Sequence, residues 1–239
     1  MRILLIGYGK MGKTIEQMAL DKGHQIAGTV DNTNAETLAN YKADNTDVAI
    51  EFTHPEAAFS NISYCLQHNI PVVSGSTGWL DKFDEAKALC QKNKGAFFYA
   101  SNYSVGVNLF FHFNEYIASK MQEYKEYQVS IREIHHLQKV DKPSGTGITA
   151  AEGILSNYPA LSGWSSDDAS DSEKLNIISE REPEVVGTHI VTYSSDIDQI
   201  ELGHIAHSRA GFAGGALMAA EWLVGKQGVY GMKDMLNLS

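Results

Sequence analysis

Residues 1–12 of the chain, MRILLIGYGKMG, decide its fold. The apolar run Arg2–Ile6 is typical of a buried strand, and Gly7, Gly9 and Gly12 follow it with the spacing G-x-G-x-x-G at the start of an expected helix. The first glycine permits a tight turn, the second lets a diphosphate approach the backbone, and the third allows close helix–strand packing. Free amides and the helix dipole favour an anion at this turn. We therefore predict a cofactor-binding βα unit with contacts from Gly7, Tyr8, Gly9, Lys10, Met11 and Gly12.

The carboxylate of Asp31 indicates that the ligand of this βα unit is a dinucleotide. Asp31 closes the second expected strand, about 20 residues beyond the last glycine, where such folds carry the acid that binds the ribose hydroxyls. A carboxylate there accepts hydrogen bonds from the ribose of NADH and repels the 2′-phosphate of NADPH, and residues 32–35 contain no arginine to offset it. The sequence predicts a preference for NADH. Use of NADPH stays open, because Lys10 could reach a phosphate.

The first part of the chain alternates short apolar runs with helix-length segments, which is typical of a parallel sheet covered on both faces. The expected strands are Arg2–Ile6, Gln25–Val30, Val48–Phe52, Pro71–Ser74 and Ala96–Tyr99, and the expected helices are Lys10–Lys22, Pro55–His68 and Asp81–Lys92. A second glycine-rich loop, Gly75–Gly78, would lie at the carboxyl edge of this sheet, where ligands bind.

After residue 103 the pattern changes. Tyr127–His136 alternates with a period of two, and Val185–Tyr193 and Gln199–His207 do so more loosely, which predicts long strands without helices between them in a mixed or antiparallel sheet. Ser162–Ser172 is expected to be a surface loop, and Ala213–Val224 a helix that returns to the first domain. The predicted fold class is α/β, a Rossmann-type doubly wound parallel sheet with an inserted α+β domain.

Composition excludes several classes of protein. The formal net charge is −10 and no block of Lys or Arg stands out, which argues against a nucleic-acid partner. No apolar run approaches the roughly 20 residues of a membrane span. The first residues are too short for a secretion signal and lack a small-residue cleavage site. With only two cysteines a disulfide scaffold is excluded, so we predict a reduced, cytoplasmic protein.

The densest polar segment is EIHHLQKVDKPSGTG, residues 133–147. It leads from an expected strand to an expected helix, Ile148–Leu155. Ser144, Gly145 and Thr146 offer N–H and hydroxyl donors at the helix start, an arrangement that suits a carboxylate. Histidine and lysine side chains supply local positive charge, and they can transfer protons near neutral pH if burial lowers the pKa of the lysine. The segment predicts a site for a small anionic substrate.

The residues of this segment also have other interpretations. Neighbouring residues of a strand point to opposite faces, so His135 and His136 cannot both bind one metal ion, and no metal site is predicted. Either histidine could be a structural side chain with satisfied hydrogen bonds. Ser144 lacks the G-x-S-x-G elbow of hydrolases, and the phosphate-binding pattern G-x-x-x-x-G-K-[ST] is absent.

The chain resembles the dihydrodipicolinate reductase (4-hydroxy-tetrahydrodipicolinate reductase) family. Residues 133–146 match the diagnostic run E-x-H-H-x-x-K-x-D-x-P-S-G-T throughout. Further agreement is found at Gly7–Gly12, Gly75–Gly78, Ser101–Asn108 and Ser208–Ala216. The match departs at Lys142, where a small residue is usual, and at Ser76, where threonine is usual.

This resemblance implies an NAD(P)H-dependent oxidoreductase that reduces 4-hydroxy-tetrahydrodipicolinate, with loss of water, to tetrahydrodipicolinate in lysine (diaminopimelate) biosynthesis. It implies a dinucleotide-binding domain at 1–102 and 209–239, and a substrate-binding domain at 103–208 whose sheet forms a homotetramer. Carried onto this chain, His135 would be the proton donor or acceptor and Lys139 the proton donor. The turn of Ser144, Gly145 and Thr146, with His136, would hold the dicarboxylate. The nicotinamide would be lined by Gly75, Ser76, Thr77, Ala100, Ser101, Asn102 and Tyr103.

Two rival functions stay open from the residues. Another two-domain Rossmann reductase of a small anionic substrate would explain the first motif but not the grouping of histidines, lysine and Ser-Gly-Thr. A non-catalytic NADH sensor would bind cofactor without turnover, and gives no reason for a cationic site in an acidic chain.

Overall fold

The computed structural model describes residues 1–168 and 170–238. The chain divides into two compact units, one formed by Met1–Val105 with the segment from Ala210 onward, and one formed by Gly106–Arg209. The second unit is therefore an insertion in the sequence of the first. Within the described residues no helix combines the length and apolar character needed to cross a membrane.

The first unit is built on a parallel sheet that, in the described chain, has six strands in the order β11-β5-β4-β3-β1-β2. Its strands are β1 (Arg2–Ile6), β2 (Gln25–Val30), β3 (Val48–Glu51), β4 (Val72–Ser74), β5 (Ala96–Tyr99) and β11 (Gly228–Tyr230). Its helices are α1 (Lys10–Asp21), η1 (Ala35–Asn40), α2 (Pro55–Gln67), η2 (Leu80–Lys82), α3 (Phe83–Lys92), α6 (Ala210–Leu223) and α7 (Met232–Met235).

Alternate residues of β1 enter two different cores, as a doubly wound sheet requires. Ile3 and Leu5 pack with residues of α1, α6 and α7, while Leu4 and Ile6 pack with residues of α2 and α3. All four side chains are at most 1% exposed. This two-sided burial explains why the strand is apolar throughout, and it confirms the predicted Rossmann-type fold.

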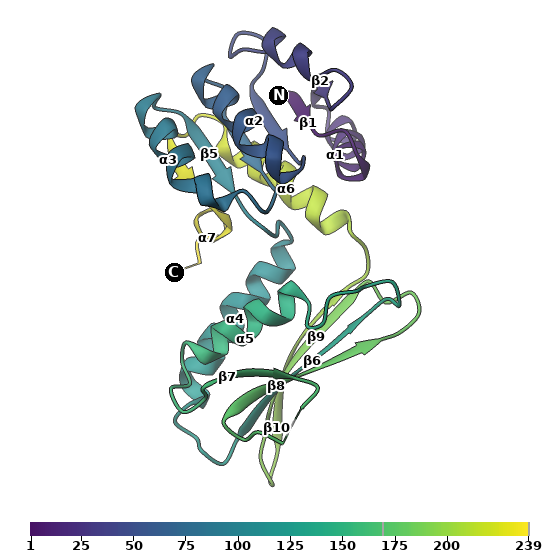
Figure 1. The fold of residues 1–239 in the computed structure, drawn as a ribbon, viewed down its shortest axis with the longest axis vertical. Coiled ribbons are helices and arrows are strands. Elements are labelled where there is room, and N and C mark those ends of the chain that lie inside the picture. Colours follow the sequence, from purple (N-terminus) through teal and green to yellow (C-terminus); the bar gives the residue numbers. More distant parts are fainter. Residues whose placement is uncertain (169, 239) are drawn as a thin grey trace. The chain divides into compact units, whose positions relative to one another are not determined.

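The second unit contains a mixed sheet, with five strands in the order β10-β9-β6-β8-β7 among the residues described. β6 pairs antiparallel with β9 and parallel with β8. The helices α4 and α5 pack on one face of the sheet through a shared apolar core (Figure 1). The elements are α4 (Val105–Met121), β6 (Gln128–His135), α5 (Gly145–Leu155), β7 (Gly163–Ser166), β8 (Lys174–Arg181), β9 (Gly187–Ser194) and β10 (Gln199–Ala206).

The sequence pattern did not predict the helix of 17 residues, α4, that precedes the strands of this unit. Two expectations for this part of the chain were wrong. The expected loop Ser162–Ser172 contains β7, because Gly163–Ser166 pairs with β8; Ala169 of that loop lies outside the described residues. The helix α5 begins at Gly145 and not at Ile148, because Ser144 caps it by accepting a hydrogen bond from the Gly147 amide.

Candidate functional site

The three glycines of the first turn have different surroundings. Gly7 has a φ of +97°, and a Cβ there would lie 1.9 Å from the carbonyl oxygen of Phe52. A Cβ on Gly12 would lie 2.3 Å from the carbonyl oxygen of Gly7. A Cβ on Gly9 would meet nothing within 4 Å. The fold therefore requires Gly7 and Gly12, whereas the space in front of Gly9 is open to a ligand.

A pocket of about 550 Å³ opens at this turn. It includes three predicted residues of the turn, Gly7, Tyr8 and Gly9, together with Asp31. Lys10, Met11 and Gly12 begin α1 and do not line it. The pocket is also lined by residues that the sequence reasoning missed: Ile6, Val30, Asn32, Ala35, Thr53, His54, Ala57 and Asn61. The signal for Thr53 and His54 was their place after β3, the strand next to β1, because carboxyl ends of adjacent parallel strands share one edge.

Asp31 is held as an ionised acceptor. Its Oδ1 accepts hydrogen bonds from the hydroxyl of Thr33 (2.6 Å) and from the amide of Thr33 (2.8 Å). The hydroxyl bond is the main cause that lowers the pKa of Asp31 below its usual range. The lining of the pocket contains no lysine or arginine. The pocket therefore offers a ligand a carboxylate acceptor and no lysine or arginine side chain.

The loop Gly75–Gly78 is anchored by a buried carboxylate at the end of β3. Glu51 is fully buried and accepts hydrogen bonds from the hydroxyls of Ser74 (2.6 Å) and Ser76 (2.7 Å). It also accepts the amide hydrogen of Thr53 at 3.0 Å. Thr77 is exposed. The loop is thus tied to the sheet at Ser76 and open to solvent at Thr77.

The predicted segment Ala100–Tyr103 lies beyond β5, at the same edge of the sheet. The hydroxyl of Tyr103 donates to the carbonyl of Ser74 at 2.6 Å, and burial raises its pKa well above the ordinary value. Tyr103 is 1% exposed and Ala100 is 9% exposed, whereas Ser101 is exposed. Tyr103 therefore supports the loop of β4 from within, and Ser101 faces solvent.

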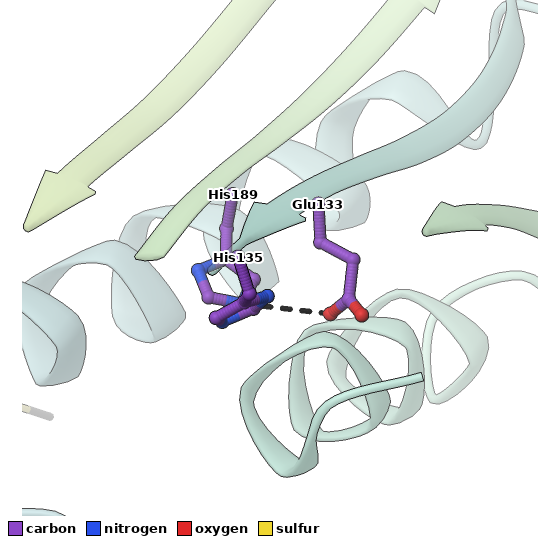
Figure 2. A group of neighbouring side chains, drawn as sticks. All are labelled: Glu133, His135 and His189. Atoms are coloured by element: carbon purple, nitrogen blue, oxygen red, sulfur yellow. Dashed lines mark ion pairs between the residues drawn. The ribbon is translucent and has the colours of Figure 1, made fainter. Parts of the chain in front are cut away.

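In the second unit, Glu133 and His135 on β6 lie close to His189 on β9 (Figure 2). Nε2 of His189 is 3.6 Å from Oε2 of Glu133, and the rings of His135 and His189 pack edge to face with centroids 5.0 Å apart. All three side chains are buried. A Cβ on Gly187 would lie 3.3 Å from Nε2 of His135, so glycine leaves room for this ring beside β9.

Burial and neighbouring charge determine the protonation of this cluster. Burial lowers the pKa of His135 to about 4, and repulsion from the charge on His189 adds to the effect. Burial alone would raise the pKa of Glu133, but hydrogen bonds from His189, Ser144 and Ser179 outweigh it and lower the pKa to about 2. At neutral pH, His135 is therefore a neutral ring and Glu133 a carboxylate.

Glu133, His135 and His189 could also hold a metal ion, since one ligand atom from each lies within 4.8 Å of the others. The oxygens of Glu133, however, already accept hydrogen bonds from Ser144 and Ser179. These bonds explain the buried carboxylate without an ion. His135 is buried and His136 partly exposed, in agreement with opposite faces for the two neighbours.

Positive side chains gather around the segment that follows β6. The ammonium of Lys139 is 2.8 Å from the carboxylate of Asp141, and Arg209 contacts Nε2 of His136 at 3.4 Å. Arg181 donates to the backbone carbonyls of Lys139 (3.1 Å) and Asp141 (2.6 Å), so it fixes the path of this loop. Sequence reasoning found His136 and Lys139 but missed Arg181 and Arg209, which come from other parts of the chain.

The start of α5 has open backbone donors. Ser144 is the N-cap, and its hydroxyl accepts the Gly147 amide at 3.0 Å. The next two amides, of Gly145 and Thr146, meet no acceptor in the described part of the chain, as expected for the first turn of a helix. Gly145 is exposed and Thr146 partly exposed. This turn can therefore bind a carboxylate.

Comparison with known proteins places both units in one family. Residues 1–103 match the family described as "Dihydrodipicolinate reductase, N-terminus", and residues 106–236 match "Dihydrodipicolinate reductase, C-terminus". The chain is 49% identical to 4-hydroxy-tetrahydrodipicolinate reductase of Christiangramia forsetii, over 99% of this chain and 98% of that protein. It is 31% identical to the reductase of Neisseria meningitidis, over 94% of this chain and 84% of that protein.

Solved structures share the fold. A dipicolinate-bound dihydrodipicolinate reductase from Paenisporosarcina superposes with a TM-score of 0.80 at 22% identity, covering 98% of both chains. An amine dehydrogenase from Mycobacterium smegmatis, at 11% identity, superposes with a TM-score of 0.61 and covers 95% of this chain and 94% of its own. From the two family matches and the full-length identity to a reductase, this chain belongs to the dihydrodipicolinate reductase family.

Proposed function

We propose that this chain is the NAD(P)H-dependent reductase that converts 4-hydroxy-tetrahydrodipicolinate to tetrahydrodipicolinate in lysine (diaminopimelate) biosynthesis. Full-length identity of 49% to a 4-hydroxy-tetrahydrodipicolinate reductase supports it. The observation that carries the substrate class is the start of α5, where the open amides of Gly145 and Thr146 belong to the same β6–α5 segment as His135, His136 and Lys139. An acidic chain concentrates cations there, as a dicarboxylate requires.

The substrate is bound by the segment from His135 to Thr146. The amides of Gly145 and Thr146 donate to one carboxylate, as the first turn of a helix does for anions. His136, beside Arg209, adds a polar contact to the dicarboxylate. Ser144 holds the turn that carries these donors. These assignments make the site specific for a small, doubly charged ring.

Lys139 and His135 handle the proton. The reaction consumes one hydride and one proton and releases water; reduced nicotinamide, when bound, supplies the hydride. Lys139 is a cation paired with Asp141 and has protons to donate. His135, neutral because of its pKa of about 4, is suited to accept a proton or a hydrogen bond. Lys139 is therefore the proton donor. His135 is the group that accepts a proton or a hydrogen bond.

The first unit binds the cofactor. The open face of Gly9 accommodates a diphosphate, and the Asp31 carboxylate accepts the ribose hydroxyls. NADH is preferred over NADPH, because the pocket lining holds a carboxylate and no lysine or arginine. The nicotinamide is lined by Gly75, Ser76 and Thr77 and by Ala100, Ser101, Asn102 and Tyr103, with Ser76 and Tyr103 acting mainly to hold the two loops.

The second unit forms a homotetramer through the open face of its sheet. Ile178, Ile190 and Ile205 lie on the face opposite α4 and α5, as the strand register requires. Ile178 is 38% and Ile205 61% exposed. Apolar side chains on an uncovered sheet face are typical of an interface between subunits. Light scattering, which measures the molar mass in solution, tests the tetramer. A cytoplasmic location stays a prediction.

The decisive experiment follows nicotinamide absorbance with substrate generated in situ from pyruvate and aspartate semialdehyde by the preceding synthase. NADH and NADPH are compared side by side. Oxidation that depends on the synthase product is expected, with NADH the better cofactor. Cofactor binding without oxidation would favour the NADH sensor, and turnover of a different carbonyl substrate in a panel would favour another Rossmann reductase.

A further inference from the structure

We propose that Glu133 is a positioning residue, whose buried carboxylate holds Ser144 and His189 and through them sets the start of α5 and the ring of His135. The inference rests on the proposed function and deepens it. It assigns a role to a side chain that is buried behind the substrate-binding segment and fully shielded from solvent.

The strand register brings the central pair together. Glu133 on β6 lies directly opposite His189 on β9 in the antiparallel ladder. Side chains opposite each other in such a pair point to the same face of the sheet. Both point to the buried face, where Glu133 is 0% and His189 4% exposed (Figure 2). Their contact is therefore built into the sheet and does not depend on a loop.

Among the described residues, four donors lie close to the carboxylate, and Nη1 of Arg181 adds an ion pair at 4.0 Å from Oε1. The amide of Ser144 donates to Oε1 (2.9 Å) and Oε2 (3.1 Å), and the hydroxyl of Ser144 donates to Oε2. The hydroxyl of Ser179 donates to Oε1 at 3.0 Å, and Nε2 of His189 approaches Oε2 at 3.6 Å. An ionised carboxylate offers about four acceptor positions, so its capacity is filled. A neutral amide of the same shape cannot accept all four donors.

The hydroxyl of Ser144 is fully used inside the protein. It gives its one hydrogen to Glu133, and it accepts from the amide of Gly147 at 3.0 Å and from Nε2 of His189 at 3.0 Å. A hydroxyl has one hydrogen and two lone pairs, so nothing is left for a substrate. Ser144 therefore transmits the position of Glu133 to the helix, and does not itself bind the dicarboxylate.

The two anchor points flank the open amides. Ser144 is tied to Glu133 directly, and Gly147 is tied to it through the Ser144 hydroxyl. A Cβ on Gly147 would lie 2.5 Å from Oε2 of Glu133, so the helix start rests directly on the carboxylate. Gly145 and Thr146 lie between these anchors. A displacement of the carboxylate would therefore turn the two amides away from a bound anion.

The second arm of the network reaches His135. Nε2 of His189 faces the Ser144 hydroxyl and the Glu133 carboxylate, which are both acceptors toward it, so this nitrogen carries a hydrogen. The His189 ring, held in that way, packs edge to face against His135. One buried carboxylate thereby orients both the anion-binding turn and the histidine of the proposed proton transfer.

Binding of dipicolinate, a stable aromatic dicarboxylate, tests the proposal by calorimetry on the full-length protein with NADH present. Glu133→Gln should weaken the binding of dipicolinate by a factor of about 10 or more, which is the loss expected when a hydrogen bond to a charged group is removed. KM for the substrate should rise by a similar factor, while kcat falls less and NADH affinity stays within about twofold. Glu133→Asp keeps the charge but is one methylene shorter, so it should not restore binding.

A matched pair of serine variants separates positioning from general loosening of the core. Ser144→Ala and Ser179→Ala each remove one hydroxyl that donates to Glu133, but only Ser144 also caps α5. Ser144→Ala should weaken the binding of dipicolinate several-fold more than Ser179→Ala does. Glu152→Gln, the same change as at Glu133 on the exposed side of α5, is expected to bind as the unmodified protein does.

The outcomes are distinct. Unchanged dipicolinate binding and KM in Glu133→Gln, or full rescue in Glu133→Asp, overturns the positioning role while the proposed function stands. If Glu133→Gln does not fold, the serine pair decides, and equal weakening in both variants overturns the proposal. An unmodified protein that neither binds dipicolinate nor oxidises NADH with the synthase product overturns the proposed function itself.

Discussion

The imidazole rings of His135 and His189 lie edge to face with centroids 5.0 Å apart, and Nε2 of His189 is 3.6 Å from the Glu133 carboxylate. His189 therefore stands between an anion and a second histidine. Burial lowers the pKa of His135 to about 4, and charge repulsion from His189 adds to this effect. The pair keeps one ring neutral beside the substrate-binding segment.

The low pKa of His135 predicts a pH dependence of stability. In the unfolded chain a histidine titrates near ~6.5, so between about pH 6.5 and pH 4 the unfolded state binds a proton that the folded state does not. The free energy of unfolding should therefore fall as the pH is lowered through this window. In His135→Gln the fall between pH 7 and pH 5 should be smaller, as measured by urea unfolding.

His207→Gln, the same change at an exposed position, is the control and should retain the full pH dependence. The Glu133 carboxylate, with a pKa of about 2, contributes stability that is lost only at more acidic pH, so it does not disturb this window. An identical slope in His135→Gln and the unmodified protein would contradict the assignment.

Lys139→Ala should lower kcat by on the order of 10²-fold, because it removes the proposed proton donor. NADH affinity should not change, since the substitution lies in the second unit and the cofactor pocket in the first. Steady-state rates and a fluorescence titration with NADH measure the two quantities. Lys174→Ala, which removes an exposed lysine paired with Asp171, should keep normal rates. Normal turnover in Lys139→Ala would remove Lys139 from the mechanism.

Gly9→Ala should lose NADH binding, whereas Gly12→Ala should lose stability. Gly9 has an extended backbone (φ −80°, ψ −156°) that alanine can adopt, and its added Cβ meets no protein atom within 4 Å. This variant should fold normally and bind NADH at least ~10-fold more weakly, because the methyl group occupies the space for the diphosphate. In Gly12→Ala the Cβ would clash with the Gly7 carbonyl at 2.3 Å, which should cost roughly 1–3 kcal/mol of stability.

Thermal unfolding and an NADH titration of the two variants separate these effects. Tight NADH binding by Gly9→Ala would show that the diphosphate does not lie against Gly9.

Asp31→Ser should shift the cofactor preference toward NADPH. The change removes the carboxylate that receives the ribose hydroxyls and repels a 2′-phosphate, so kcat/KM with NADH should fall about 10-fold and the ratio of NADPH to NADH activity should rise. Asp84→Ser, on the first turn of α3, serves as the control for the loss of one negative charge. If Asp31→Ser keeps the ratio of the unmodified protein, Asp31 does not select the cofactor.

Local patterns were sufficient for the first unit. Strands β1, β3, β4 and β5 are largely buried on both faces, and the edge strand β2 is partly buried, so each is a short, mostly apolar run. The glycines at 7, 9 and 12 mark the turn that follows the first of them. The second unit was harder. Gly163–Ser166 is polar and part of a Ser/Asp-rich segment, and it is a strand only because β8 offers a partner edge. The helix α4 buries one face against the sheet but carries a mixed aromatic pattern that predicted no element.

The sequence by itself determined the parts of the proposed site that are contiguous, namely the glycine turn, Asp31, and the segment that holds His135, His136, Lys139 and Ser144. Their spacing along the chain is their spacing in a βα unit or a strand–turn–helix, so local geometry was enough. The tertiary structure decided the partners of these residues. Glu133 meets His189 through the register of β6 and β9, and Arg181 reaches the backbone of Lys139 from β8. These pairs are distant in sequence, and only the strand order and register, which depend on packing of the whole unit, bring them together.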